Sequence, residues 1–240
     1  MTILVIDSSG LVASVAIMTE EAMLAEYTVN YKKTHSQTLL PMINELVTML
    51  EIDLKTIDAI AIAKGPGSFT GLRIGSATAK GLGLALDKPI IEIPTLDALA
   101  YNVYGGDFVI CPLMDARRNQ VYTGLYTIDN GELTVIQEQC AVELPEIIEK
   151  VNTLDKKVIF LGDGVDAYKN QLEEFVKVTY EFAPSHVAKQ RAGAVGVLAL
   201  SYFRDHKIKT AVEHVPTYLR LSQAERELAE KQKQKNESLN

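Results

Sequence analysis

The first half of the chain alternates between apolar and polar residues in a pattern that predicts an antiparallel meander. Residues 2–7 form an apolar run that ends on an aspartate, and residues 13–18 and 23–29 alternate with a period of two. A period of two is typical of β-strands with one buried face, and short turn segments separate the runs. We therefore predict three consecutive strands at the start of the protein.

Two helices are predicted beyond the meander, at residues 35–51 and 69–86. The apolar side chains of the first cover about half of the helical circumference, which is wider than the usual core stripe. The second carries small residues every four positions from Gly71 to Gly83. Four-residue steps fall on one helix face, so another helix could approach that face closely. We interpret the two helices as a docking surface for a second molecule, and burial under another layer of the same chain is the alternative.

A buried strand at residues 59–63 leads into a glycine-rich loop at residues 64–71. Glycine lets the backbone approach other atoms closely, and Ser68 or Thr70 can cap the helix that follows. A strand, a glycine loop and a helix start also form phosphate sites, because free N–H groups and the helix dipole attract an anion. The loop lacks the Lys-Ser/Thr ending of a Walker A motif, so tight helix packing is the competing interpretation.

The second half of the chain repeats the order of elements in the first. Paired glycines at residues 105–106 mark the boundary, because glycine pairs commonly separate patterned segments. Strands, a helix, another strand and a glycine turn follow, at residues 108–114, 120–128, 133–137, 145–151, 157–161 and 162–164. This duplication predicts two tandem subdomains of βββαβα type, at residues 1–105 and 106–221. We expect a helix at residues 192–203 to pack back on the first subdomain, and a charged, disordered tail at residues 222–240.

Each copy carries an acidic residue directly after its first strand, Asp7 in the first and Asp115 in the second. Two such copies describe the α/β fold shared by actin, sugar kinases and chaperone ATPases, in which a nucleotide lies in the cleft between the copies. The candidate nucleotide or phosphate site consists of strand-end and glycine-turn residues, namely Asp7, Ser8, Gly65, Gly67, Ser68, Asp115, Gly162 and Gly164. Strand-end aspartates also commonly cap turns, and the sequence offers no matching general base, so catalysis is not favoured.

Composition narrows the classes of function further. The 240 residues carry a formal net charge of -7, which disfavours RNA binding by this chain alone. Cys111 and Cys140 are far apart and form no CxxC pair, as expected of buried thiols in a reduced cytosolic protein. The chain begins with neither a basic n-region nor a long apolar stretch, so we expect a cytoplasmic protein without a membrane segment. Its four histidines form no HxxxH pair, and no metal site is predicted.

Four strings of the sequence are distinctive. They are residues 4–9, 64–75, 115–118 and 216–220, which read LVIDSS, KGPGSFTGLRIG, DARR and PTYLR. These strings resemble the TsaB family, formerly YeaZ, of bacterial tRNA threonylcarbamoyladenosine biosynthesis proteins. The resemblance extends from Ile3 to about Arg220, with small departures at Ser8 and Gln120.

The resemblance implies an ASKHA (actin-like ATPase) fold and a non-catalytic accessory subunit. In this family the partner is a catalytic paralogue, TsaD, which transfers a threonylcarbamoyl group to adenosine 37 of ANN-decoding tRNAs, and a TsaE-type P-loop ATPase completes the complex. It implies that tRNA is bound only through the complex and that the chain alone forms a homodimer. No cofactor is firmly implied, although ATP or ADP could bind at the partner interface or in the interdomain cleft.

The family's heterodimer also implies a helix bundle built from the first two helices of each partner. Its interface residues, carried over to this chain, are Leu39, Ile43, Leu46, Leu72, Gly75, Ser76 and Ala79, with Arg73 and Lys80 as rim charges. A stand-alone ATP-dependent small-molecule kinase of the same fold is the alternative function. A peptidase is not supported, because no Ser, His and Asp set or metal motif can be assembled from the local strings.

Overall fold

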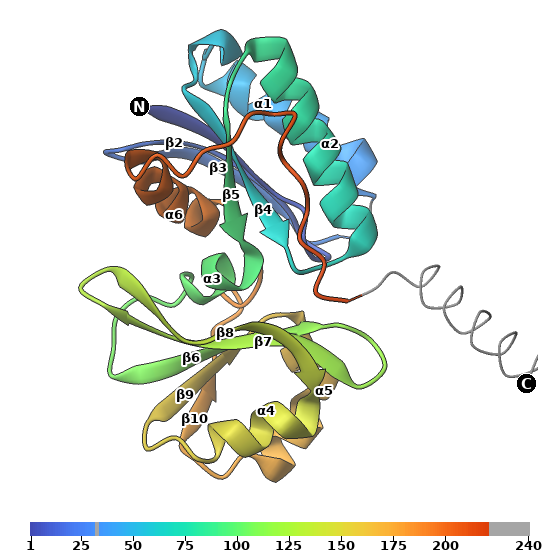
Figure 1. Cartoon of the computed structure of the whole chain (residues 1–240), viewed down its shortest axis with the longest axis vertical. Helices are drawn as coiled ribbons and strands as arrows, with labels where there is room; N and C mark the ends of the chain where they lie inside the picture. The colour runs from blue at the N-terminus through green and yellow to red at the C-terminus, as the bar shows by residue number, and fades with distance from the viewer. Residues whose placement is uncertain (32–33, 221–240) are drawn as a thin grey trace, which may run out of the picture.

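The structure, a computed structural model, describes residues 1–31 and 34–220, which form two α/β subdomains stacked along the long axis of the molecule (Figure 1). The first subdomain contains β1 (Thr2–Asp7), β2 (Ala13–Thr19), β3 (Met23–Val29), β4 (Ala59–Gly65) and β5 (Ile90–Pro94). The second contains β6 (Phe108–Asp115), β7 (Gln120–Asp129), β8 (Glu132–Glu143), β9 (Lys157–Leu161) and β10 (Tyr180–Phe182). The tail predicted at residues 222–240 lies outside the described residues.

The two sheets have the same strand order. It is β3-β2-β1-β4-β5 in the first sheet and β8-β7-β6-β9-β10 in the second. In each sheet the first three strands pair antiparallel, and the fourth strand pairs parallel with the first. The duplicated α/β fold predicted from the sequence is therefore confirmed.

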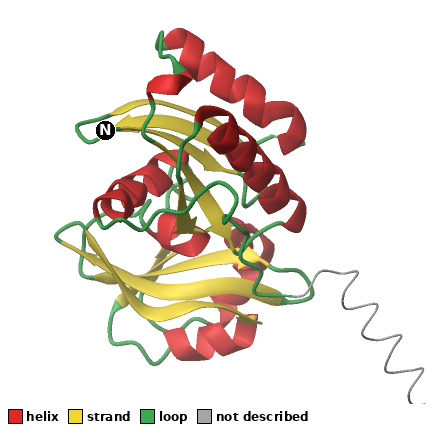
Figure 2. Cartoon of the chain, turned by 45° about the horizontal axis from the view of Figure 1, so that its top comes forward, coloured by secondary structure: helices red, strands yellow, loops and turns green. Residues whose placement is uncertain are grey.

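Two of the helices, one from each half of the sequence, pack against the sheet of the other half. The helices are α1 (His35–Met49), α2 (Phe69–Leu86), α3 (Thr95–Ala100), α4 (Leu144–Val151), α5 (Asp163–Phe175) and α6 (Ala192–Arg204), with the short helix η1 (Leu54–Thr56). α1 and α2 cover one face of the first sheet, and α6, from the second half of the sequence, covers the other face (Figures 1 and 2). Conversely, α3 packs Leu96 and Leu99 against Ile110 and Tyr126 of the second sheet. In the described part of the chain, no helix has both the length and the apolar content that a membrane span requires.

The side chains predicted to form the partner interface are buried in the core of this chain, so that prediction is wrong for most of them. Gly75 is buried, and Leu39, Ile43, Leu46, Leu72, Ser76 and Ala79 are each at most 6% exposed. The sheet itself covers them, because β1, β2 and β4 present a continuous row of isoleucine, leucine and valine side chains to α1 and α2. The two predicted rim charges are the exception, since Arg73 is exposed and Lys80 is half-buried.

The small-residue face of α2 packs mainly against a turn and a loop, with the start of α1 beside Gly71. A β-carbon added at Gly71 would lie 2.1 Å from the Ser8 carbonyl oxygen, and one at Gly83 would lie 2.9 Å from Cβ of Ala211. The β1–β2 turn therefore approaches the start of α2, and the C-terminal part of the chain approaches its end. Spacing thus predicts a bare helix face but does not fix which elements fill most of it.

Residues 205–220, which we call the C-terminal arm, return along the first subdomain after α6 (Figure 1). The arm pairs with the sheet edge through Lys209 and Ile90, whose backbones exchange hydrogen bonds of 2.8 and 2.9 Å. Farther along, His214 Nδ1 lies 2.8 Å from the Glu92 carboxylate, and Lys209 Nζ lies 2.9 Å from it. Burial alone would raise the pKa of Glu92, but the hydrogen bonds from His214 and Lys209 outweigh it and hold the pKa at about 2. An ionised carboxylate thus fastens the arm to β5.

Candidate functional site

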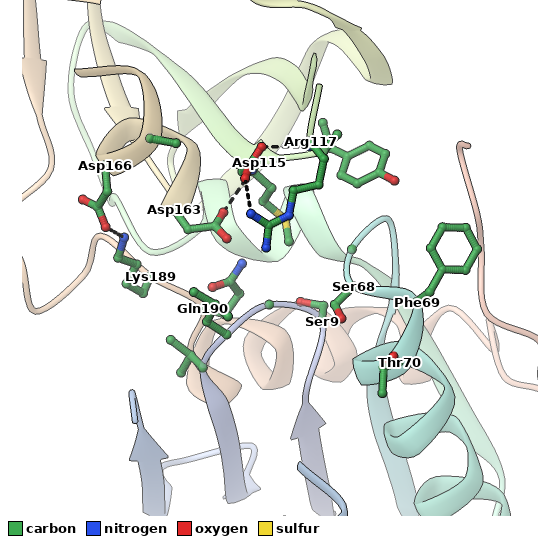
Figure 3. A pocket seen from close by; sticks show the side chains of 18 of the residues that line it. Ser9, Ser68, Phe69, Thr70, Asp115, Arg117, Asp163, Asp166, Lys189 and Gln190 are labelled. Carbon is green, nitrogen blue, oxygen red and sulfur yellow. Dashed lines mark hydrogen bonds and ion pairs between the residues drawn. The ribbon is translucent and has the colours of Figure 1, made fainter. Parts of the chain in front are cut away.

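A cleft of about 790 Å³ lies between the two subdomains (Figure 3). Because β1 and β4 run toward it from one sheet and β6 and β9 from the other, the residues after these strands form its walls. The first subdomain contributes Ser9, Gly67 and the first residues of α2, and the second contributes Asp115, Asp163 and the β6–β7 turn. This is the site at which the duplicated fold predicted a nucleotide.

The first strand-end aspartate does not reach this cleft. Asp7 is 1% exposed and accepts hydrogen bonds from the Ser9 backbone N–H (2.9 Å) and the Ser9 hydroxyl (2.6 Å). Burial raises the pKa of Asp7, although the hydrogen bonds from Ser9 act in the opposite direction. Ser8 is also buried, and its hydroxyl donates to the Gly71 carbonyl (2.9 Å). The prediction that Asp7 and Ser8 face a ligand was therefore wrong, because both residues hold the β1–β2 turn against α2.

The glycine loop before α2 has much of its hydrogen-bonding capacity already in use. Gly65 N–H donates to Thr95 Oγ1 (3.0 Å), and Ser68 N–H donates to the Ser9 carbonyl (2.7 Å). Ser68 also caps α2, as predicted, since its hydroxyl accepts from Gly71 N–H (3.3 Å). A β-carbon at Gly67 would lie 2.2 Å from the Ser9 carbonyl oxygen. The backbone N–H groups of Gly65 and Ser68 are thus not free to bind a phosphate, and the glycines serve close packing.

The second strand-end aspartate has a different environment. Asp115 lies in the cleft wall with its side chain 18% exposed, and it pairs with Arg117 at 3.1 Å. It also accepts a hydrogen bond from the Tyr168 hydroxyl (3.1 Å). Its backbone N–H donates to Asp163 (3.3 Å), a carboxyl whose pKa is raised first by burial and further by the charge of Asp115. Two carboxyl groups therefore lie together on this wall, one paired with arginine and one largely buried.

The glycine turn of the second subdomain also serves packing. Gly162 has φ +102°, and a β-carbon there would lie 2.0 Å from the Leu113 carbonyl oxygen. A β-carbon at Gly164 would lie 2.9 Å from the same residue. The N–H of Gly162 donates to the Ala188 carbonyl (2.7 Å). These glycines let α5 start close against β6, and the N–H of Gly162 is already used within the chain.

Several cleft residues were not identified from the sequence. Asp163 and Asp166 come from the start of α5, and Lys189 pairs with Asp166. Gln190 is 2% exposed and lies so close to Gly10 that a β-carbon on that glycine would meet its amide at 2.8 Å (Figure 3). Arg220 reaches the cleft from the C-terminal arm. The aspartates could have been found from the glycine turn that they flank, but no sequence pattern connects residues 189 and 220 with this cleft.

Within residues 1–31 and 34–220, no group of three His, Cys, Asp or Glu side chains could hold a metal ion. The two histidines with side-chain hydrogen bonds are used in packing, since His35 bonds the Gly10 carbonyl (2.9 Å) and His214 bonds Glu92. Burial raises the pKa of the Cys111 thiol to about 12, so that thiol stays protonated at neutral pH. The cleft is therefore a polar surface with several paired side chains, and the described residues place no group of metal ligands in it.

Comparison with known proteins identifies the family of this chain. A family model described as TsaD, tRNA N6-adenosine threonylcarbamoyltransferase, matches residues 22–228. The tRNA threonylcarbamoyladenosine biosynthesis protein TsaB of Bacillus subtilis is 35% identical over 233 residues, which cover 97% of this chain and 100% of that protein. The chain belongs to the TsaB family.

A solved structure of a TsaB-family protein has the same fold. YeaZ from Pseudomonas aeruginosa is 27% identical to this chain, with a TM-score of 0.77 that covers 91% of this chain and 99% of that one. The fold also resembles that of the activator of the 2-hydroxyisocaproyl-CoA dehydratase from Clostridium difficile with bound ADPNP, with a TM-score of 0.50 that covers 86% of this chain and 97% of that one. The identity is only 9%, so this likeness concerns the fold alone. Both the family resemblance and the ASKHA fold predicted from the sequence are confirmed.

Proposed function

We propose that this chain is a non-catalytic accessory subunit that binds and activates a TsaD-type threonylcarbamoyltransferase. In this role it supports the formation of threonylcarbamoyladenosine at position 37 of ANN-decoding tRNAs in the cytoplasm, within a complex that also includes a TsaE-type ATPase. Membership of the TsaB family, over nearly the full length of the chain, is the observation that carries the proposal.

The asymmetry of the cleft supports the non-catalytic part of the proposal. A phosphoryl-transfer site of this fold needs exposed carboxylates for metal and water, and free amides for phosphates. Here Asp7 is enclosed by Ser9, and Gly65 and Ser68 donate to oxygens of the same chain. Three of the groups that the first half of such a site would use are therefore engaged in contacts within the chain.

The partner surface consists of the outer faces of α1 and α2, not the buried residues named from the sequence. These faces expose large apolar side chains, with Leu40 55%, Met49 73% and Leu84 62% exposed. Among the exposed residues of α2 are also three small ones, Ala77, Gly81 and Ala85. An apolar surface with small neighbours suits close docking of helices from a paralogue, or from a second copy of the chain when the paralogue is absent.

Binding to the TsaD-type paralogue of the same organism tests this surface. Leu84→Glu places a charge on the exposed apolar face in the last turn of α2, so we expect the affinity for the paralogue to fall about tenfold or more, with tRNA threonylcarbamoylation falling in parallel. Ile136→Glu is the matched control, because Ile136 is 47% exposed on β8 of the other subdomain. Full affinity of the Leu84→Glu chain in gel filtration and titration would contradict the proposed surface.

The alternative kinase function and the binding of ATP or ADP are tested with the same preparation. A kinase of this fold would release ADP in the presence of an acceptor and would lose that activity on Asp115→Asn, since Asp115 is the strand-end acid that faces the cleft. We expect no turnover from the chain alone. Acceptor-dependent ADP release that disappears in Asp115→Asn would replace the subunit proposal with the kinase.

A further inference from the structure

Three arginines from separate segments line the cleft, Arg73, Arg117 and Arg220, and the exposed Arg118 adjoins Arg117 in the sequence; we call these four residues the arginine rim. Arg73 lies on α2, Arg117 and Arg118 form the β6–β7 turn, and Arg220 ends the described part of the C-terminal arm. Arg220 donates to the carbonyls of Ala116 and Arg117, which joins the arm to the turn. The rim is therefore a single surface that spans both subdomains.

The β6–β7 turn holds its two arginines in an uncommon backbone conformation. Arg117, Arg118 and Asn119 have φ values of +67°, +56° and +59°, all in the left-handed region. Each such residue costs on the order of 1 kcal/mol when it is not glycine. The Arg117 side chain is 81% exposed, and Arg118 is also exposed. The turn thus exposes the Arg117 and Arg118 side chains, and backbone hydrogen bonds with Asp115 and Gln120 hold its conformation.

An aromatic pair adjoins the rim. The rings of Phe69 and Tyr218 stack with centroids 4.6 Å apart and planes inclined by 5°. The Arg73 guanidinium lies 5.9 Å from the Tyr218 ring centroid, and its Nε donates to the Tyr218 hydroxyl (3.3 Å). Tyr218 remains 38% exposed. Aromatic rings and arginine planes together are the combination on which unpaired bases stack.

The charge of the rim is opposite to that of the whole chain. Among the residues that the structure describes, Asp115 is the carboxylate paired with the rim; it is largely covered and bonded to Arg117. Arg118 forms no ion pair within the described residues. Lys189, deeper in the cleft, is balanced by Asp166. A chain with a formal net charge of -7 therefore concentrates positive charge at one edge, next to exposed rings.

We propose that the arginine rim contacts the sugar-phosphate backbone of RNA while tRNA is held by the complex. This inference rests on the proposed function, because the rim would be the surface through which the accessory subunit contacts the tRNA bound by the complex. Guanidinium groups pair with phosphates in bidentate geometry, and the adjoining rings favour a nucleic acid over an acidic protein segment. The overall negative charge of the chain explains why the rim acts only when the paralogue presents the tRNA.

Filter binding of an unmodified tRNA transcript to the assembled complex, over a series of NaCl concentrations, tests the rim. Arg118→Glu should weaken binding about tenfold, and Arg118→Gln should lower the slope of log K against log salt by roughly 0.7–0.9, the value for one lost phosphate contact. Tyr218→Ala should lower affinity without changing that slope. Lys55→Glu is the matched control, because Lys55 is exposed on η1, at the end of β4 that points away from the cleft.

The outcomes separate this inference from the proposed function. Equal tRNA affinity of the Arg118→Glu and Lys55→Glu complexes would overturn the rim while leaving the subunit role intact. Failure of Arg118→Glu to assemble with the paralogue would also overturn it, because the rim would then be a protein contact. Normal assembly together with weakened tRNA binding supports it, whatever Leu84→Glu does to the paralogue.

Discussion

The two subdomains share one topology, yet their strand-end aspartates have different roles. Asp7 is sealed beneath the β1–β2 turn, with Ser9 supplying both of its hydrogen bonds. Asp115, at the same place in the second copy, lies in the cleft wall and contacts Arg117 and Tyr168. The two copies therefore share the position of the acid but not its environment. The residue two positions after each aspartate, Ser9 or Arg117, determines whether a ligand could reach it.

The glycine turns of the two copies show the opposite behaviour, because they have the same role. A β-carbon at Gly67 or at Gly162 would collide with a carbonyl oxygen of the neighbouring first-strand segment, at 2.2 and 2.0 Å. The fold therefore requires glycine in both copies before any ligand is considered. A glycine loop in this fold is evidence of close backbone packing first, and of phosphate binding only when its amides are free.

The largest expected effect comes from adding a side chain to glycines that lie against a backbone carbonyl oxygen. Gly71→Ala in the first copy and Gly162→Ala in the second should each lower the free energy of unfolding by about 2–4 kcal/mol, because the new methyl group meets a backbone carbonyl that cannot move away. Urea unfolding measures both. If only one of the two variants is destabilised, the glycines of the two copies do not share a packing role.

Gly81→Ala is the matched control on the same helix as Gly71. A β-carbon at Gly81 would meet no atom within 4 Å. The variant should therefore stabilise the protein by about 0.5–1 kcal/mol, the difference in helix propensity between glycine and alanine.

Glu92 provides a second test, within the first subdomain. Glu92→Gln removes the ionised acceptor of His214 and Lys209, so we expect a loss of about 1–3 kcal/mol at pH 7. Because the folded pKa of Glu92 is about 2 and its ordinary value is 4.5, this stabilisation is complete above pH 4.5 and disappears as the pH falls toward 2. Urea unfolding of both proteins from pH 2 to pH 7 checks it. An equal difference at every pH would show that the carboxylate charge is not what fastens the arm.

Asp7 should give a smaller effect with the opposite pH dependence. Its pKa is raised in the folded state, so its contribution to stability is complete below 3.8 and declines as the pH rises through the folded value. In Asp7→Asn this decline is absent, so the parent protein should lose stability relative to the variant as the pH rises, by about 1.4 kcal/mol for every tenfold weakening of the Asp7 acidity on folding. Paired unfolding curves at acidic and neutral pH measure the difference, and a parallel pH dependence of the two proteins would contradict the buried state of Asp7.

Sequence patterns were sufficient for the duplication, for the strand-end acids and for the Ser68 cap, because these depend on local periodicity and turn chemistry. They were not sufficient to predict which face of α1 and α2 is covered. Ile43 and Leu46 belong to a broad apolar surface, and periodicity cannot say whether a sheet or a second protein buries it. Substitutions such as Ile43→Asp or Gly75→Leu would consequently act through folding, so the exposed Leu84 is the informative position.

Only some of the residues that line the cleft could be predicted from the sequence, for a similar reason. Asp115 ends a recognisable strand, but Lys189 and Gln190 lie directly before α6 and Arg220 ends the arm, and α6 and the arm bring the second half of the chain back to the first subdomain. Long-range crossing of this kind leaves no local signature in the sequence. Tyr218 and Arg220 carried the family resemblance, yet only the structure places them beside Phe69 and the β6–β7 turn.

The exchange of α3 and α6 between the sheets has a practical consequence for dissecting the molecule. Severing the chain at Gly105–Gly106 would deprive the first sheet of Val195 and Ala199, and the second of Leu96 and Leu99. Each fragment would expose an apolar sheet surface and would be prone to aggregate. The paired glycines therefore mark the repeat in the sequence, but they do not separate two units that could fold independently. Experiments on this protein should keep both halves in one polypeptide.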